Sequence, residues 1–310
     1  MLRLDDLGVF HRVTDYSKRI NPSQQHHPRF DPRIVLLIGV AVVSIASSLI
    51  KLINAPPLVI ATYRLGIASS IMFVGSGRNL NQLKRLNIRE RLTLTTAGLF
   101  LCLHFACWIT SLRFTTIASS VIIVDSSPIF VLLFSSLLLK ERASKNERYG
   151  IILSIFGAMI IVSSHLQIGT NIFGDLLALM GAMTVAMYLI IGRGLRSKLD
   201  TFPYTTGVYG ISFIFLLIIT LIFNEPLTGY HWTDYRLMFL LAIGPSCIGH
   251  TAYNYCLKYL KASTVSISIL GEPLGATILG VLIFNEAPNA LMILGGTMIV
   301  IGTYVAIWNP

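Results

Sequence analysis

The chain has 310 residues, of which 54% are hydrophobic and only 12% are charged, whereas an ordinary soluble domain has roughly 25% charged residues. This composition argues against a water-soluble fold and predicts a protein embedded in a lipid bilayer. The net charge of +10 would suggest a nucleic-acid partner in a soluble protein, but here the placement of the cations matters more than their number, and we expect no such partner.

Residues 1–33 form a polar segment that precedes the first apolar run. The segment contains three prolines and the polar stretch 23–27, and it lacks the apolar core that a signal peptide needs. We therefore expect a disordered cytoplasmic tail.

Ten apolar runs follow the tail, most of them close to the length that a helix needs to cross about 30 Å of hydrocarbon. The strands of a membrane barrel would be shorter and would alternate in polarity, which runs such as 211–223 do not. The sequence therefore predicts an all-α membrane protein with ten transmembrane helices near residues 34–53, 57–75, 92–112, 116–139, 149–164, 173–192, 204–223, 237–257, 262–284 and 288–308.

The cations fall in alternate gaps between these helices. Of the 24 Lys and Arg residues, 20 lie in the tail and in the gaps after the second, fourth, sixth and eighth helices, and three lie on the opposite side: Lys51, Arg113 and Arg236. Short cytoplasmic loops hold the excess of cations in membrane proteins. We therefore expect both termini in the cytoplasm, and an inner (plasma) membrane as the simplest location.

The two halves of the chain resemble each other at an offset of 145 residues. Leu112, Pro128, Glu141, Gly150 and Gly157 correspond to Leu257, Pro273, Glu286, Gly295 and Gly302. Each half, 34–164 and 173–308, holds five helices, and because five is odd, the second half must enter the membrane in the opposite orientation. The sequence predicts two inverted five-helix repeats, with a stable bundle of another kind as the alternative.

Short motifs in both halves resemble those of the EamA type of the drug/metabolite transporter superfamily. They occur at residues 55–64, 126–128, 140–142, 174–179, 271–273, 285–286 and 295–297. The resemblance covers 34–308. It implies that helices one to four and six to nine surround a central cavity, with helices five and ten outside it. It also implies transport of a small organic solute without naming it.

Three ionisable side chains fall near the middle of predicted helices, where each costs about 2.5–3.5 kcal/mol on insertion scales. They are Arg64 in the second helix, Asp125 in the fourth and Glu272 in the ninth. In a functional interpretation Arg64 attracts an anionic group of the substrate, while Glu272 or Asp125 binds a coupling proton or an amine. The alternative is a structural ion pair between Arg64 and Asp125.

Prolines mark the same depth in both halves. Pro273 follows Glu272, and the matching Pro128 follows Ser127. Because proline removes one backbone hydrogen bond, we expect the fourth and ninth helices to be broken locally there, as in the binding sites of other transporters.

The third and eighth helices each carry a histidine at a similar place. His104 with Trp108, and His250 with Asn254, are spaced four residues apart and so share a helix face. The inverted repeat places His104 in the outer half of the membrane and His250 in the inner half. The histidines could act as pH-sensitive gates or proton relays. Alternatively, each makes one interhelical hydrogen bond and never titrates. Trp108 is expected to form a cavity wall or a packing contact, and Tyr253 a packing contact.

No pattern in the sequence indicates catalysis, a cofactor or a bound metal. Cys107 and Cys247 lie three residues from the two histidines, but buried cysteines usually behave as small apolar residues. No HExxH motif, aspartate dyad or phosphate-binding GxxxxGKT loop is present.

The sequence thus predicts a secondary active transporter for a small metabolite that works by alternating access, with proton or ion coupling as an option. Amino acids and related amphiphiles are one substrate class to consider. The alternatives are a channel or a partner-dependent membrane scaffold, with an intramembrane enzyme as the weakest. The sequence leaves open the choice between import and efflux and the oligomeric state.

Overall fold

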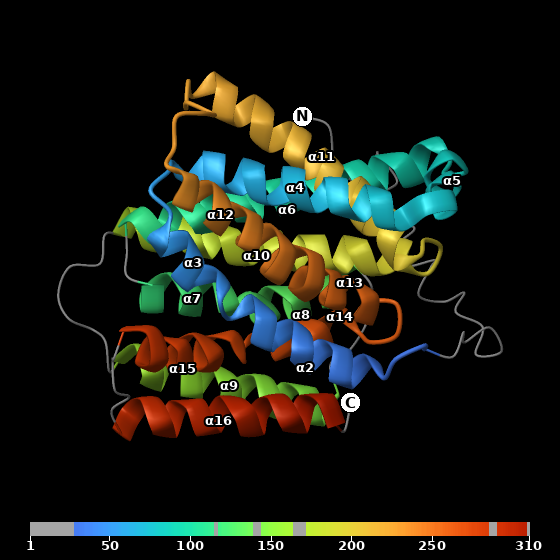
Figure 1. Ribbon diagram of the computed structural model, residues 1–310. Helices are drawn as coiled ribbons and strands as arrows, with labels where there is room; N and C mark the ends of the chain where they lie inside the picture. The colour runs from blue at the N-terminus through green and yellow to red at the C-terminus, as the bar shows by residue number, and fades with distance from the viewer. Residues whose placement is uncertain (1–27, 115–116, 139–143, 164–171, 285–289, 309–310) are drawn as a thin grey trace, which may run out of the picture.

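The computed structural model describes residues 28–114, 117–138, 144–163, 172–284 and 290–308, which form one bundle of helices (Figure 1). All regular structure within these ranges is helical. Most of the predicted tail lies outside the described residues, as do the motif residues 140–142 and 285–286.

The five ranges predicted to be helical in the first half are helical where they are described. They are α2 (Pro32–Val43) with α3 (Ala46–Leu52), α4 (Pro57–Ser76), α6 (Ile88–Phe114), α7 (Ile117–Asp125) with α8 (Ser127–Leu138), and α9 (Lys145–Ser163). A 3-10 turn (Gly77–Leu80) and the short α5 (Asn81–Lys84) connect α4 to α6.

The second half repeats this order. Its elements are α10 (Ile172–Arg196), α11 (Thr201–Ile222), α12 (Trp232–Leu241) followed by the π-helical η4 (Ala242–His250) and α13 (Thr251–Cys256), α14 (Ala262–Ile269) with α15 (Glu272–Phe284), and α16 (Ala290–Trp308). By length and composition, five stretches of the described chain could each cross a membrane: Pro32–Leu52, Pro57–Lys84, Ile88–Phe114, Leu176–Arg196 and Thr201–Ile222.

Two of the helical breaks occur where the sequence predicts them. The fourth segment is interrupted at Ser126, whose backbone N–H donates to the Ile123 carbonyl at 3.2 Å. The ninth is interrupted at Leu270 and Gly271, and the Gly271 N–H donates to the Ser268 carbonyl at 3.0 Å. Each break lies just before a proline, which cannot supply the N–H that a continuous helix needs.

Helices α9 and α16 pack on each other along one edge of the bundle, at the bottom of Figure 1, while α11 lies at the opposite edge. Glycines allow this close contact. A Cβ atom at Gly157 would lie 2.5 Å from the Gly295 carbonyl oxygen, and one at Gly302 would lie 2.6 Å from the Gly150 carbonyl oxygen. These two contacts are related by the 145-residue offset, so repeat-related glycines make equivalent contacts.

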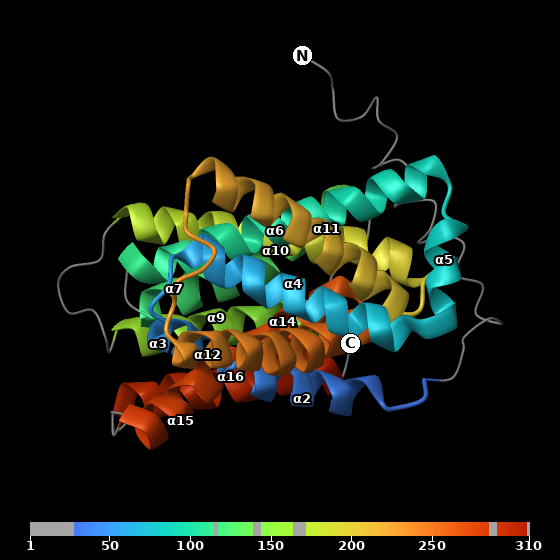
Figure 2. The ribbon, with the colours of Figure 1, turned by 45° about the horizontal axis from the view of Figure 1, so that its top comes forward.

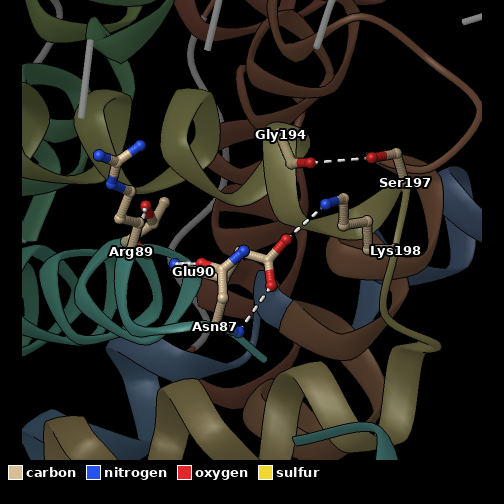
Figure 3. Close-up of polar contacts among 7 residues, drawn as sticks. Asn87, Arg89, Glu90, Gly194, Ser197 and Lys198 are labelled. Atoms are coloured by element: carbon tan, nitrogen blue, oxygen red, sulfur yellow. Dashed lines mark hydrogen bonds and ion pairs between the residues drawn. The ribbon is translucent and has the colours of Figure 1, made fainter. Parts of the chain in front are cut away.

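The start of α2 and the end of α16 lie at the end of the bundle that carries α5, on the right in Figures 1 and 2. Polar contacts connect the two halves there. Figure 3 shows Glu90, in the first turn of α6, paired with Lys198, while Asn87 and Glu90 bond each other's backbone N–H groups at 2.9 and 3.0 Å. This is a capping box, and Glu90 therefore both caps α6 and contacts the second half.

Arg196 differs from its predicted place among the loop cations. Its side chain is only 1% exposed. Its Nε donates to the Asn254 carbonyl at 2.7 Å and its Nη2 to the Thr201 hydroxyl at 2.6 Å. The guanidinium therefore joins α10 to α11 and α13 inside the bundle, because the chain turns back directly after α10.

Candidate functional site

Arg64 lies two turns into α4, which Pro57 begins at a position where the missing N–H costs nothing. The side chain is fully buried, and its Nε donates to the Ser246 hydroxyl at 2.7 Å. The guanidinium carbon lies 4.2 Å from the centre of the Phe105 ring and 5.8 Å from that of Trp108. Its Nη1 and Nη2 have no hydrogen-bond partner among the described residues.

The structure does not pair Arg64 with Asp125. Neither residue takes part in an ion pair within the described part of the chain, and Asp125 Oδ2 is also buried without a hydrogen-bond partner there. The structural ion pair that the sequence left open is therefore absent. A buried donor on Arg64 and a buried acceptor on Asp125 therefore remain available.

Asp125 and Glu272 lie at the two helical breaks. Asp125 is the last residue of α7 and is 3% exposed, and Glu272 is the first residue of α15. The Tyr253 hydroxyl donates to Glu272 Oε1 at 2.9 Å. The two carboxyl groups are close enough to interact electrostatically, as are Glu272 and Arg64. The breaks thus bring an acidic pair within reach of the buried arginine.

The two histidines meet inside the bundle. Their ring centres are 6.5 Å apart, so the third and eighth segments bring them close together. His104 stacks on Trp108 at 5.9 Å, and its Nδ1 is 3.0 Å from the Gly181 carbonyl. That bond joins α6 to α10. It is a hydrogen bond of the kind expected if the histidine is structural and does not titrate. The His250 ring contacts those of Phe105 at 5.3 Å and Tyr253 at 5.7 Å.

Asn254 belongs to a neighbouring hydrogen-bond network. Its Oδ1 accepts from the Tyr188 hydroxyl at 2.6 Å, and its Nδ2 donates to the His250 carbonyl at 2.9 Å and the Tyr209 hydroxyl at 3.4 Å. These bonds connect α13 to α10 and α11. Asn254 is fully buried and has all its polar atoms occupied, so it supports the site more than it offers a contact to a ligand.

Arg64 and the side chains around it come from both halves and from five of the predicted transmembrane segments. A continuous set of contacts runs from Arg64 through Phe105 and His250 to Tyr253 and Glu272. His104 and Trp108 join it through ring contacts. We define the central cluster as Arg64, His104, Phe105, Trp108, Asp125, Ser246, His250, Tyr253 and Glu272.

Sequence reasoning missed three members of the central cluster: Phe105, Ser246 and Tyr253. Tyr253 was expected only to pack, yet it donates to Glu272. The 145-residue offset is a signal that could have identified it, because Tyr253 is the counterpart of Trp108. The same offset makes Phe105 the counterpart of His250, whereas Ser246 corresponds to Leu101 and has no such signal.

The central cluster offers donors, acceptors and aromatic faces to one bound molecule. Two guanidinium nitrogens on one arginine match the two oxygens of a carboxylate. An unpartnered carboxyl oxygen on Asp125 can accept from a cationic or protonated group. The rings of Phe105 and Trp108 can contact the apolar part of a solute.

Comparison with known proteins identifies relatives of both halves. The model of the EamA-like transporter family matches residues 33–163 and 172–308. An uncharacterized transporter of Archaeoglobus fulgidus is 27% identical over 208 residues, which cover 66% of this chain and 71% of the relative. The pseudopaline exporter CntI of Pseudomonas aeruginosa strain UCBPP-PA14 is 28% identical over 218 residues, covering 67% of this chain and 72% of the relative.

A protein of known crystal structure has the same fold. It superposes with a TM-score of 0.74 at 17% sequence identity, covering 89% of this chain and 97% of that chain.

Proposed function

We propose that this chain, which belongs to the EamA-like transporter family and is a multi-pass membrane transporter, works as a secondary carrier for a small carboxylate-bearing solute. One observation carries the proposal: the Nη1 and Nη2 groups of Arg64 are fully buried and have no hydrogen-bond partner among the described residues. A buried polar group without a partner is costly, and a bound carboxylate would satisfy both nitrogens at once.

The rest of the central cluster favours an amphiphilic solute. Asp125 and Glu272 would face the cationic end of a zwitterion, and Phe105 and Trp108 its apolar part. Amino acids and related compounds combine these features. The name of CntI says that it exports pseudopaline, which favours testing export before import.

The carboxyl pair also supports proton coupling. Asp125 is buried and Glu272 is partly buried, and the two carboxyl groups interact electrostatically, so a negative charge on both at once is unfavourable. One proton shared by this pair would be released or taken up as a substrate amine arrives or leaves. Glu272 is the residue we expect to be needed for transport against a gradient.

The packing of the helices supports ten crossings arranged as two inverted repeats. The first and sixth segments are counterparts, and so are the third and eighth. The packing of α2 against η4 and α13 therefore corresponds to the packing of α10 against α6. In the same way, α4 against η4 becomes α11 against α6.

Charged contacts follow the same symmetry. Arg113 donates to the Ala55 carbonyl, and its counterpart Lys258 pairs with Asp200, which is the counterpart of Ala55. This arrangement would let the halves rock about the central cluster and expose it to each side in turn. The placement of the cations further supports an inner membrane location with both termini in the cytoplasm.

A thermal-stability screen of the purified protein tests the proposed substrate class. The screen would cover amino acids, organic acids, nucleosides and sugars at two pH values, because a ligand that binds only the folded protein raises its melting temperature. We expect the stabilising compounds to carry a carboxylate, and we expect their effect to disappear in Arg64→Gln. Stabilisation by neutral sugars alone, or by carboxylates equally in wild type and Arg64→Gln, would contradict the proposal.

A further inference from the structure

The eighth segment differs from its counterpart in the first half. The third segment is one continuous helix, α6, whereas the eighth contains the π-helical η4 between α12 and α13. Pro245 lies within η4 and cannot donate a backbone hydrogen bond. Wider turns of this kind are frequent at functional sites. The departure from repeat symmetry therefore falls at the residues that reach the central cluster.

Ser246, the residue after that proline, receives contacts from both halves of the chain. Its hydroxyl accepts from Arg64 Nε at 2.7 Å, and its carbonyl accepts from the Tyr209 hydroxyl at 3.2 Å. Tyr209 is the counterpart of Arg64 at the 145-residue offset. Repeat-related positions on α4 and α11 thus converge on one fully buried serine.

The hydrogen bond to Ser246 restricts how Arg64 can bind an anion. A guanidinium can bind a carboxylate from the side, through Nε and one Nη, or from the end, through Nη1 and Nη2. In this protein Nε is already occupied, and Phe105 covers one face of the guanidinium at 4.2 Å. Only the end-on pair of nitrogens remains available.

We propose that Ser246 is a positioning residue that holds Arg64 by its Nε and so commits it to end-on binding of the substrate carboxylate. The part of this inference that concerns the substrate rests on the proposed function. The part that concerns Arg64 itself does not.

The first measurement needs no ligand. In protein labelled with nitrogen-15 arginine, the Nε–H signal of Arg64 is identified by its loss in Arg64→Lys, and its exchange with water is followed by NMR. We expect slow exchange in the wild type and in Ser246→Thr, which keeps the hydroxyl, and fast exchange in Ser246→Ala. Tyr209→Phe serves as a control variant. It removes the contact to the Ser246 carbonyl and leaves the Ser246 hydroxyl in place, so we expect exchange to stay slow. Equally slow exchange in Ser246→Ala would overturn the inference.

The second measurement uses benzoate and benzamide as matched probes that differ in the carboxylate. We expect Ser246→Ala to weaken benzoate binding about tenfold, to leave benzamide binding unchanged and to be rescued by Ser246→Thr. Equal weakening of both probes would show a merely structural role and overturn the inference. If no carboxylate of the stability screen binds the wild-type protein but the exchange of Arg64 Nε–H depends on Ser246, the proposed function fails and the positioning of Arg64 stands.

Discussion

A fully buried guanidinium with two unpartnered nitrogens is an expensive feature for the interior of a helical bundle. The hydrogen bond to Ser246 and the contact with the ring of Phe105 offset part of that cost. The remaining cost is consistent with a residue kept for binding and not for stability.

Replacing Arg64 tests this balance. We expect Arg64→Met to raise the stability of the ligand-free protein by about 1–2 kcal/mol, because it removes an unpaired buried charge. The same variant should lose all stabilisation by carboxylates. The apparent melting temperature in detergent, with and without ligand, reports both effects.

Arg196 provides the matched control. It is also a buried arginine, but its hydrogen bonds to the Asn254 carbonyl and the Thr201 hydroxyl are made within the protein. Arg196→Met should therefore destabilise the protein by about 3 kcal/mol or more. A loss of stability in Arg64→Met as large as that in Arg196→Met would assign Arg64 a structural role.

Asp200, between α10 and α11, gives a pH-dependent contribution outside the membrane-spanning segments. The Gln82 amide donates to it at 2.7 Å and Lys258 lies 3.5 Å away. The hydrogen bond from Gln82, helped by the charge of Lys258, lowers the pKa of Asp200 despite its partial burial. The stabilisation is therefore present above the usual carboxyl pKa, about 4, and is lost as the pH falls through the lower pKa of the folded state.

We expect Asp200→Ala to lower the apparent melting temperature by a constant amount between pH 6 and 8, and by less below about pH 4. The effect should be at most about 1 kcal/mol, because the side chain is half exposed and its charge is screened. Melting curves of the two proteins across this pH range measure it. A difference that stays constant down to pH 3 would contradict the assigned cause.

At the residue level, the sequence identified the ionisable members of the central cluster but not how they are paired. Arg64, Asp125 and Glu272 stand out because charges are rare at membrane depth. Whether Arg64 pairs with Asp125 depends on side-chain directions that two separate helices set together. The contacts of Phe105 and Ser246 depend on helices distant in sequence, so no local pattern predicts them.

At the level of helices, glycine decides how closely α9 and α16 approach. A Cβ at Gly157 would lie 2.5 Å from a backbone oxygen of Gly295, which cannot move aside as a side chain could. Gly157→Ala should push the two helices apart and destabilise the protein by about 2 kcal/mol. Thermal unfolding in detergent measures this loss.

Gly194→Ala is the control for that change, because nothing lies within 4 Å of the Cβ it would add on α10. We expect no destabilisation there, and a gain of up to about 1 kcal/mol from the better helix propensity of alanine. Equal losses in the two variants would show that helix packing is not the cause.

Helix positions follow from the sequence because apolar length and proline placement are local properties. The ten predicted ranges are helical where described, and the breaks before Pro128 and Pro273 lie where expected. The π-helical turn in η4 was not predicted. Its Pro245 can be read from the sequence, whereas the hydrogen bond from the Tyr209 hydroxyl to the Ser246 carbonyl joins helices that are distant in sequence.

At the level of the whole molecule, the proposed inverted repeat predicts which loops face which side of the membrane. Ser197, in the turn between α10 and α11, should face the cytoplasm, and Thr228, between α11 and α12, should face the exterior. With the four native cysteines replaced, a membrane-impermeant maleimide added to whole cells should label Thr228→Cys and not Ser197→Cys. Labelling of Ser197→Cys alone would reverse the proposed orientation, and labelling of both would contradict this topology.

The central claim is that the protein is a carrier whose Arg64 binds the carboxylate of its solute. Counterflow in proteoliposomes tests it most directly, using a radiolabelled form of the most strongly stabilising carboxylate. If the protein is a carrier, unlabelled solute inside the vesicles accelerates entry of the label. If Arg64 binds the solute, Arg64→Gln abolishes this acceleration. Rapid entry of the label without acceleration would indicate a channel, and acceleration that persists in Arg64→Gln would remove Arg64 from the binding site.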